Sequence, residues 1–265
     1  MAKARICREK IDLNKLSDSD KSMLSDRLFS QIFDRIWSGF SRDQFHKYFF
    51  EGQFPLNRIY LFKSEQKIVG YLIVKFVHID IRRRKYSIFR VSANVLPKYT
   101  GNQLVTWPVF LESCKCFLTW ALTPRRLFIF LTSNSPASYC AMYKRTRKIY
   151  PSPDQKTPGK ILELLPSLSE KFNLNIETHS PFVCRFSGVG LSNPYIVKQQ
   201  ENNLSEGSLF YKKLCPDYSE GQALITLLPL DIVSGLLETM NQIQSALKNK
   251  FKNIFKKQKN VTVEP

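Results

Sequence analysis

The sequence has no uninterrupted apolar run of the roughly 18 residues that a membrane-spanning helix needs. Its basic N-terminal residues 1–5 are not followed by the hydrophobic core of a secretory signal peptide. The six cysteines are scattered, and the one close pair, Cys114 and Cys116, lacks the spacing, second pair and neighbouring histidine of a zinc site. We therefore expect reduced thiols, no metal site and a cytoplasmic protein.

Acidic residues are also few. Only 22 Asp and Glu face 40 Lys and Arg, which gives a formal net charge of +18 over 265 residues. This excess favours polyanionic partners such as nucleic acid, anionic lipid or phosphorylated ligands, and the alternative is a solvated basic surface. Hydrophobic residues make up 43% and aromatic residues 13%, so the chain can bury a sizeable core and does not have a disordered composition.

A strand, a polar turn and an apolar segment of helical length follow one another near the middle of the chain. Ile88–Leu96 is rich in β-branched and aromatic residues, which predicts a strand, and Pro97 ends it because proline has no N–H to donate. Backbone N–H groups around Gly101, at the start of the following helix, are of the kind that bind phosphate. Lys98 adds a mobile positive charge to this turn. The alternative is that Gly101 only makes the turn.

A second strand and helix follow. Leu127–Leu131 is an apolar run that predicts a buried strand, and the residues after it, including Asn134, are of types that cap helices. Ala137–Lys148 then predicts a helix that carries Tyr139 and Tyr143.

This order of elements resembles the GNAT superfamily, the acyl-coenzyme A-dependent N-acyltransferases. The family's pyrophosphate motif, Arg/Gln-x-x-Gly-x-Gly/Ala after its fourth strand, is similar to Lys98-x-x-Gly101-x-Gln103. The resemblance covers roughly residues 1–200. It implies an α/β fold of the α+β kind, with a mixed, mostly antiparallel central sheet flanked by helices. It also implies that acetyl-CoA or another acyl-CoA is a substrate, with its pyrophosphate bound by Lys98, Thr100, Gly101, Asn102 and Gln103.

The resemblance further implies roles for single residues. Asn134 falls in step with an Asn at the end of the family's fifth strand. The helical tyrosine that protonates the departing thiolate would lie midway between Tyr139 and Tyr143 by the family's spacing, so both stay candidates. A backbone N–H near Ala93 to Val95 would donate to the thioester carbonyl and stabilise the tetrahedral oxyanion.

Polar side chains in strand segments suggest a cleft. Arg90, Ser92 and Asn94 alternate along one face of their strand, and a polar face in a central strand is costly unless a cleft or partners receive it. His78, on the preceding strand, is a candidate base for the acceptor amine, with Glu65 as an alternative. The competing interpretation of His78 is a structural hydrogen bond.

Other segments complete the expected fold. N-cap residue clusters at 16–20 and 41–43 predict two helices near the N-terminus. Residues 158–173 predict one inserted helix, and the segments 208–214 and 223–228 predict further strands.

The C-terminal part differs from the rest. We expect an acyltransferase-like domain over residues 1–228 and a basic amphipathic helical tail over 229–265. The lysines between 248 and 259, together with apolar residues, suit an anionic membrane surface, which would make the protein peripherally membrane-associated. The alternative is that the tail docks on the core and its end is solvated.

Two functions follow from these observations. The first is an acyl-CoA-dependent N-acyltransferase that transfers an acetyl or longer acyl group to a primary amine of a small molecule or a protein by direct attack. The second is a catalytically inactive protein of the same fold that binds anionic lipid, nucleic acid or a protein partner.

Overall fold

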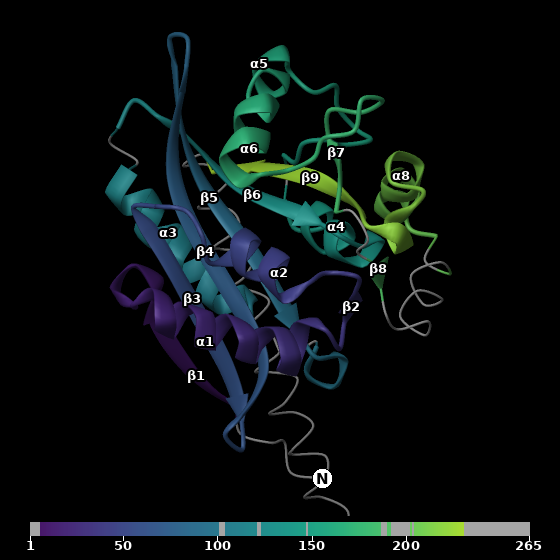
Figure 1. Cartoon of the computed structure of the whole chain (residues 1–265). Helices are drawn as coiled ribbons and strands as arrows, with labels where there is room; N and C mark the ends of the chain where they lie inside the picture. Colours follow the sequence, from purple (N-terminus) through teal and green to yellow (C-terminus); the bar gives the residue numbers. More distant parts are fainter. Residues whose placement is uncertain are drawn as a thin grey trace, which may run out of the picture.

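The protein is built around one seven-stranded sheet with strand order β1-β3-β4-β5-β6-β9-β7 (Figure 1). The computed structural model describes residues 6–100, 104–120, 123–146, 148–186, 190–191, 202 and 204–230. The strands are β1 (Ile6–Asp12), β3 (Leu56–Ser64), β4 (Lys67–Ile81), β5 (Arg84–Val95), β6 (Arg126–Ser133), β7 (Val183–Arg185) and β9 (Gln222–Pro229). Their pairing is antiparallel except between β5 and β6, which confirms the predicted mixed, mostly antiparallel sheet.

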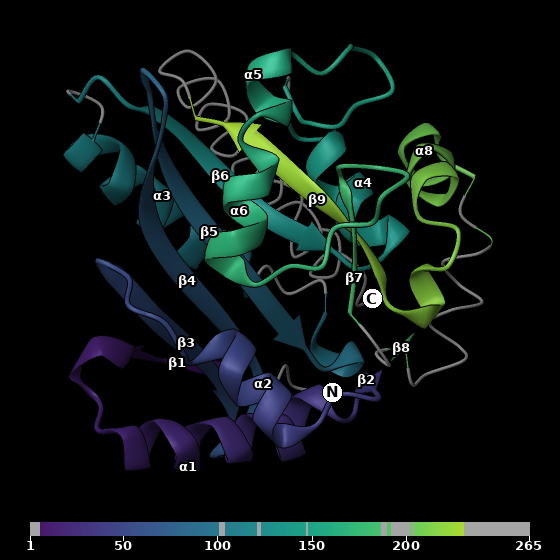
Figure 2. The same cartoon turned by 45° about the horizontal axis from the view of Figure 1, so that its top comes forward.

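Helices cover both faces of this sheet (Figures 1 and 2). On one face α1, α2, α5 and α6 pack on the strands, and α3 packs on the other. The helices are α1 (Asp18–Leu28), α2 (Arg42–Phe49), α3 (Thr106–Trp120), α4 (Pro136–Tyr143), α5 (Gly159–Leu162), α6 (Leu165–Phe172) and α8 (Glu206–Leu214). A small two-stranded sheet joins β2 (Trp37–Ser38) to β8 (Gly190–Leu191).

The predicted N-caps are confirmed at both N-terminal helices. The Ser17 side chain accepts a hydrogen bond from the backbone N–H of Asp20 at the start of α1. Ser41 and Gln44 form a reciprocal capping box at the start of α2. Each cap satisfies backbone N–H groups that a helix start leaves without partners.

The parallel pairing of β5 and β6 is short. It runs from Tyr86 opposite Arg126 to Arg90 opposite Phe130. Both strands continue beyond that point, β5 to Val95 and β6 to Ser133, and each stays bonded to its outer neighbour, β4 or β9. The two central strands therefore separate after Arg90, and this separation positions the site described below.

The inserted segment contains two short helices rather than the single helix predicted over 158–173. α5 ends at Leu162 and α6 begins at Leu165. Pro166 has no N–H to bond the carbonyl of Leu162, so one continuous helix cannot form. The predicted apolar face is nevertheless buried, because Leu165, Leu168 and Phe172 are all nearly inaccessible.

The prediction of a strand over residues 208–214 is wrong, because the segment lies in α8. Glu206 occupies the first turn of this helix, and Lys212 and Lys213 occupy its last turn. This charge order complements the helix dipole and favours a helix. The strand predicted over 223–228 is confirmed as β9.

Residues 231–265, which include the predicted basic tail, lie outside the described residues. No helix in the described part of the chain is long and apolar enough to cross a bilayer. The six cysteine thiols are free, as predicted.

Helix α3 is attached to the sheet by the buried carboxylate of Glu112, whose side chain is 0% exposed. Its Oε1 accepts hydrogen bonds from Tyr60 Oη and from Lys10 Nζ at 3.2 Å, and its Oε2 accepts one from Arg58 Nη1 at 2.9 Å. Burial raises the pKa of Glu112, but the hydrogen bonds from Tyr60 and Lys10 and the nearby positive charges outweigh it, so the pKa lies below its usual value.

A Glu112→Gln variant should therefore lose stability. Removing one partner of a buried ion pair costs about 3–5 kcal/mol, and we expect a lower urea midpoint at pH 7. Since the folded-state pKa is depressed, the contribution of Glu112 is present above the unfolded-state pKa and is lost as the pH falls through the folded-state value. The gap between wild type and variant should thus shrink in acid. Glu9→Gln, which removes an exposed partner of Lys63, is the control and should cost about 1 kcal/mol or less. Equal losses in both variants would contradict the anchoring role of Glu112.

Candidate substrate pocket between the diverging strands

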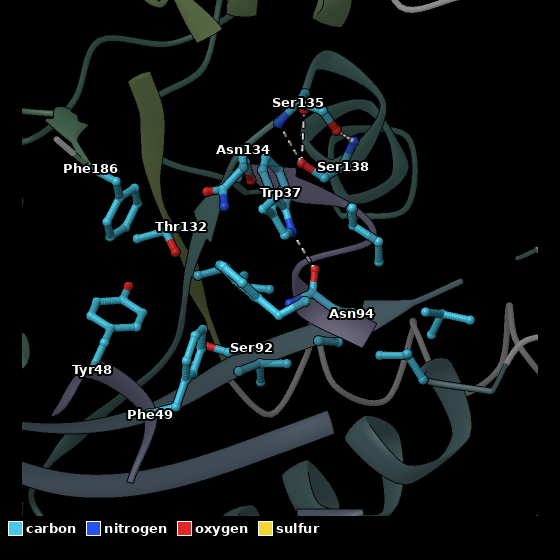
Figure 3. Close-up of a pocket in the computed structure, with 18 of the residues that line it drawn as sticks. Trp37, Tyr48, Phe49, Ser92, Asn94, Thr132, Asn134, Ser135, Ser138 and Phe186 are labelled. Carbon is cyan, nitrogen blue, oxygen red and sulfur yellow. Dashed lines mark hydrogen bonds between the residues drawn. The ribbon is translucent and has the colours of Figure 1, made fainter. Parts of the chain in front are cut away.

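A cavity of about 400 Å³ occupies the space where β5 and β6 separate (Figure 3). This volume is within the range of roughly 300–1,000 Å³ typical of small-molecule sites. The two strands, the first turns of α4 and the segment around α2 all contribute to its wall. The described lining residues are Phe33, Ile36, Trp37, Phe40, Tyr48, Phe49, Val91, Ser92, Ala93, Asn94, Val95, Val105, Leu131, Thr132, Ser133, Asn134, Ser135, Ser138, Met142 and Phe186.

The inner edges of both strands face this cavity without a strand partner. Residues 91–95 pair with β4 only, and residues 131–133 pair with β9 only. In a strand, the backbone groups that are not used on one edge point toward the other. The cavity is therefore bordered by backbone donors and acceptors that an extended ligand can bind. Ala93 and Val95, predicted near the thioester carbonyl, both line it.

Asn94 fixes the wall opposite α4. Its Oδ1 accepts a hydrogen bond from Trp37 Nε1 at 2.8 Å, and its Nδ2 donates to Tyr71 Oη at 2.7 Å (Figure 3). Polar residues on this strand face were predicted to lie in a cleft, and Ser92 and Asn94 both line the cavity.

The N-cap of α4 is Ser135, whereas Asn134 was among the residues expected to cap this helix. Ser135 forms a capping box with Ser138 in which each side chain bonds the other residue's backbone N–H at 3.3 Å. Asn134 is thereby not needed as a cap. Its Oδ1 is buried without a hydrogen-bond partner among the described residues, and the residue lines the cavity. A buried oxygen of this kind is suited to accept a hydrogen bond from a ligand N–H.

Aromatic side chains form the remaining wall. The rings of Phe40, Tyr48 and Phe186 pack edge to face, with centroid distances of 5.3–6.4 Å. The side chains of Tyr48 and Thr132 point toward one another (Figure 3). Burial raises the pKa of Tyr48, although the charge of Arg90 partly opposes this rise. No local sequence pattern marks Tyr48 or Phe186 as a site residue, because an aromatic residue in a helix or strand most often packs in the core.

Tyr139 and Tyr143, the predicted thiolate acids, do not line the cavity. Tyr139 is 0% exposed, and its hydroxyl donates to the Pro151 carbonyl at 2.9 Å. The Tyr143 hydroxyl bonds to Asp154 Oδ2 at 2.8 Å and Glu206 Oε2 at 3.0 Å. Burial raises the pKa of each tyrosine above its usual value. The two hydroxyls therefore connect α4 to the segment 151–154 and to the start of α8.

His78, the predicted base, lies away from the cavity. Its Nδ1 is hydrogen-bonded with Ser87 Oγ at 3.0 Å. This contact agrees with the alternative interpretation, in which His78 makes a structural hydrogen bond. Ser87 precedes Val91, the first residue of this strand that lines the cavity, by four residues, a separation of about 13 Å along a strand. Burial, and next the charge of Arg125, lower the pKa of His78.

The predicted phosphate turn is described only in part. Lys98 and Thr100 are exposed on and just after the short 3₁₀ turn Pro97–Tyr99, and the Thr100 hydroxyl donates to the Pro97 carbonyl at 2.7 Å. Gly101, Asn102 and Gln103 lie outside the described residues. Pyrophosphate binding here stays a prediction.

No family model and no curated protein matches the sequence. Among solved structures, the chain is similar to Arabidopsis thaliana NAA60 in complex with acetyl-CoA, at 16% identity and a TM-score of 0.34, covering 55% of this chain and 87% of that one. It is also similar to a ribosomal-protein-alanine N-acetyltransferase from Brucella melitensis biovar Abortus, at 10% identity and a TM-score of 0.36, covering 58% and 97%. A third is an aminoglycoside acetyltransferase from an uncultured soil metagenomic sample in complex with sisomicin, at 15% identity and a TM-score of 0.33, covering 58% and 91%.

All three are acetyltransferases of the GNAT superfamily that the sequence resembles. Each likeness is partial and concerns the fold.

An Asn94→Leu variant tests how the pocket wall is held. It would leave Trp37 Nε1 and Tyr71 Oη without their partners, and an unsatisfied buried polar group costs about 1–3 kcal/mol. We expect a lower urea midpoint and a changed tryptophan fluorescence spectrum. Asn202→Leu, at an exposed position, is the matched control and should change neither. If the two variants unfolded at the same urea concentration, Asn94 would not hold the wall.

Proposed function

We propose that the protein is an acyl-CoA-dependent N-acyltransferase, in the simplest case an acetyltransferase, that acts on a primary amine. The observation that carries this proposal is the separation of β5 and β6 around a cavity bordered by unpaired strand backbone. An acyl thioester can lie in that gap as an extended chain. A backbone N–H near Ala93 to Val95 would then stabilise the oxyanion that forms at the thioester carbonyl without reorganising.

The reaction that this geometry supports is direct attack. The amine nitrogen bonds to the thioester carbonyl carbon, and the carbon–sulfur bond then breaks. The amine loses a proton, and the departing thiolate gains one to leave as coenzyme A. The acceptor is an amine-bearing small molecule or protein.

Tyr48 is the candidate proton donor for this step. Its hydroxyl is buried and has no hydrogen-bond partner of acceptable geometry among the described residues, although Arg90 and Thr132 lie next to it. Its raised pKa keeps it protonated at neutral pH. Tyr48 lines the cavity, whereas Tyr139 and Tyr143 do not.

A second function is that of a catalytically inactive protein of the same fold that binds anionic lipid, nucleic acid or a protein partner. Within the described lining there is no histidine and no carboxylate to accept a proton from the amine. This observation favours a non-catalytic protein of the same fold. The net charge of +18 would then serve an anionic partner, such as lipid, nucleic acid or an acidic protein surface.

Binding of coenzyme A tests both functions. The diphosphate would be held by Lys98, Thr100 and the backbone of 101–103, with Asn134 bonding the pantetheine amide. We expect calorimetry to detect both CoA and acetyl-CoA, and Gly101→Val to abolish binding because a side chain there blocks the approach of phosphate to the backbone. Gly159→Val is the matched control, since the space around Gly159 is open, and it should bind normally. The absence of heat and of any thermal shift at millimolar ligand would exclude the transferase and leave only the non-catalytic function.

Substituting single tyrosines tests the transfer step. Tyr48→Phe keeps the ring and removes only the hydroxyl, so the variant should fold and bind acetyl-CoA like wild type. Its kcat, measured as thiol release with a panel of amines, should fall about a hundredfold, which is typical for loss of a general acid. Tyr139→Phe and Tyr143→Phe are the comparison variants. A larger loss in either of them would reassign the proton donor to that residue, as the resemblance first implied.

A further inference from the structure

Arg90 is a buried cation at the point where β5 and β6 part. It belongs to the last residue pair of the two strands, opposite Phe130, and it is only 4% exposed. Its Cζ lies 4.5 Å from the ring centroids of both Tyr48 and Phe172. Its Nη2 is buried and has no hydrogen-bond partner among the described residues.

A second buried cation stands beside it. Lys75 is directly opposite Arg90 in the pairing of β4 with β5 and is 3% exposed. Its Nζ donates to the Glu51 carbonyl at 3.2 Å and lies 4.5 Å from the ring centroid of Phe54. Burial, and next the charge of Arg90, lower the pKa of Lys75 to about 7. In the described part of the chain, no ion pair joins a carboxylate to either side chain.

This arrangement is costly for the folded protein. Moving a charge out of water is unfavourable unless a partner of opposite charge or a full set of hydrogen bonds replaces the water. Like charges opposite each other on neighbouring strands add to this cost. The same sheet shows the compensated case at Glu112, which contacts Lys10, Arg58 and Lys115. Arg90 therefore lacks the negatively charged partner that would offset the cost of burying its guanidinium.

The end of the cavity nearest the last β5–β6 residue pair, which we call the apex, is the place where such an anion can enter. Tyr48, whose ring contacts the Arg90 guanidinium, lines the cavity, and so does Thr132 across the gap (Figure 3). Ser92 is the next residue on the same strand face as Arg90 and also lines the cavity, about 7 Å along the strand. Arg90 does not itself line the cavity, but its guanidinium contacts the ring of Tyr48, which does, and it lies two residues from Ser92.

We propose that Arg90 binds a carboxylate carried by a substrate at the apex of this pocket. The inference rests on the proposed function, because it takes the cavity as the substrate site. A guanidinium in contact with aromatic rings presents its N–H edge, and this planar edge matches a carboxylate in a bidentate pair. The carboxylate has two possible sources: an acyl group that ends in a carboxylate, or an acceptor amine that also carries one.

Two ligand pairs separate these sources. The donor arm compares succinyl-CoA with acetyl-CoA by calorimetry, and the acceptor arm compares phenylalanine with phenylalaninamide in the presence of coenzyme A. In wild type we expect the carboxylate-bearing member of one pair to bind about ten- to a hundredfold more tightly, as for a hydrogen bond to a charged group. Arg90→Met should remove that preference, and Arg90→Lys should restore it in part because it keeps the charge but not the bidentate edge.

Stability supplies a readout that distinguishes binding from a structural role. Because Arg90→Met removes an uncompensated buried charge, its urea midpoint should equal or exceed that of wild type. Arg126→Met, at an exposed position of β6, is the matched control and should change neither the preference nor the midpoint. A wild type that binds coenzyme A but shows no preference in either arm would overturn the inference and leave the proposed function standing. A preference that survives in Arg90→Met, or a large loss of stability in that variant, would overturn it as well.

Discussion

The short parallel pairing of β5 with β6 is the constraint on which the rest of the site depends. Each strand is bonded on its outer edge to its end, β5 to β4 as far as Val95 and β6 to β9 as far as Ser133. The inner edges are bonded only up to Arg90 and Phe130. The sheet can therefore open in its middle without losing its outer hydrogen bonds, and the opening leaves backbone groups available in a cavity of about 400 Å³.

Two buried charges, those of Glu112 and Arg90, differ in whether other side chains of the protein neutralise them. Glu112 on α3 has cationic partners from β1 and β3, and these contacts attach a helix to the sheet. Arg90 is buried to a similar degree, contacts aromatic rings, and has an unsatisfied Nη2 in the described part of the chain. The fully paired Glu112 carboxylate stabilises the fold, whereas the unpaired Arg90 guanidinium beside a cavity is suited to bind an anion.

Much of the fold could be predicted from local patterns. Runs of β-branched, aromatic and apolar residues located β5 and β6, and N-cap residues located α1 and α2. The errors arose where two local signals compete. Apolar residues in 208–214 suggested a strand, but the charge order of α8 favoured a helix. Asn134 was among the residues expected to cap α4, but the N-cap is the next residue, Ser135.

The site was predicted less completely than the fold. Ala93, Val95 and Asn134 line the cavity, because a strand and the turn after it determine where their backbone lies. His78 is paired with Ser87 and shares a sheet face with Val91 and Ala93, so distance along the strands and not side-chain phase keeps it out of the cavity. Tyr48 and Trp37 come from segments far from β5 in the sequence, so no local spacing could connect them to it.

The sequence by itself determined the order of elements from β5 to α4, the excess of positive charge and the polar face of β5, because each of these depends on neighbouring residues alone. The tertiary structure decided which of those residues meet. It ended the pairing of β5 and β6 at Arg90, turned Tyr139 and Tyr143 away from the gap, and brought Tyr48 against Arg90. Contacts of this kind depend on how α2, α4 and α6 pack across the sheet, and packing between distant segments is not encoded in any one stretch of the chain.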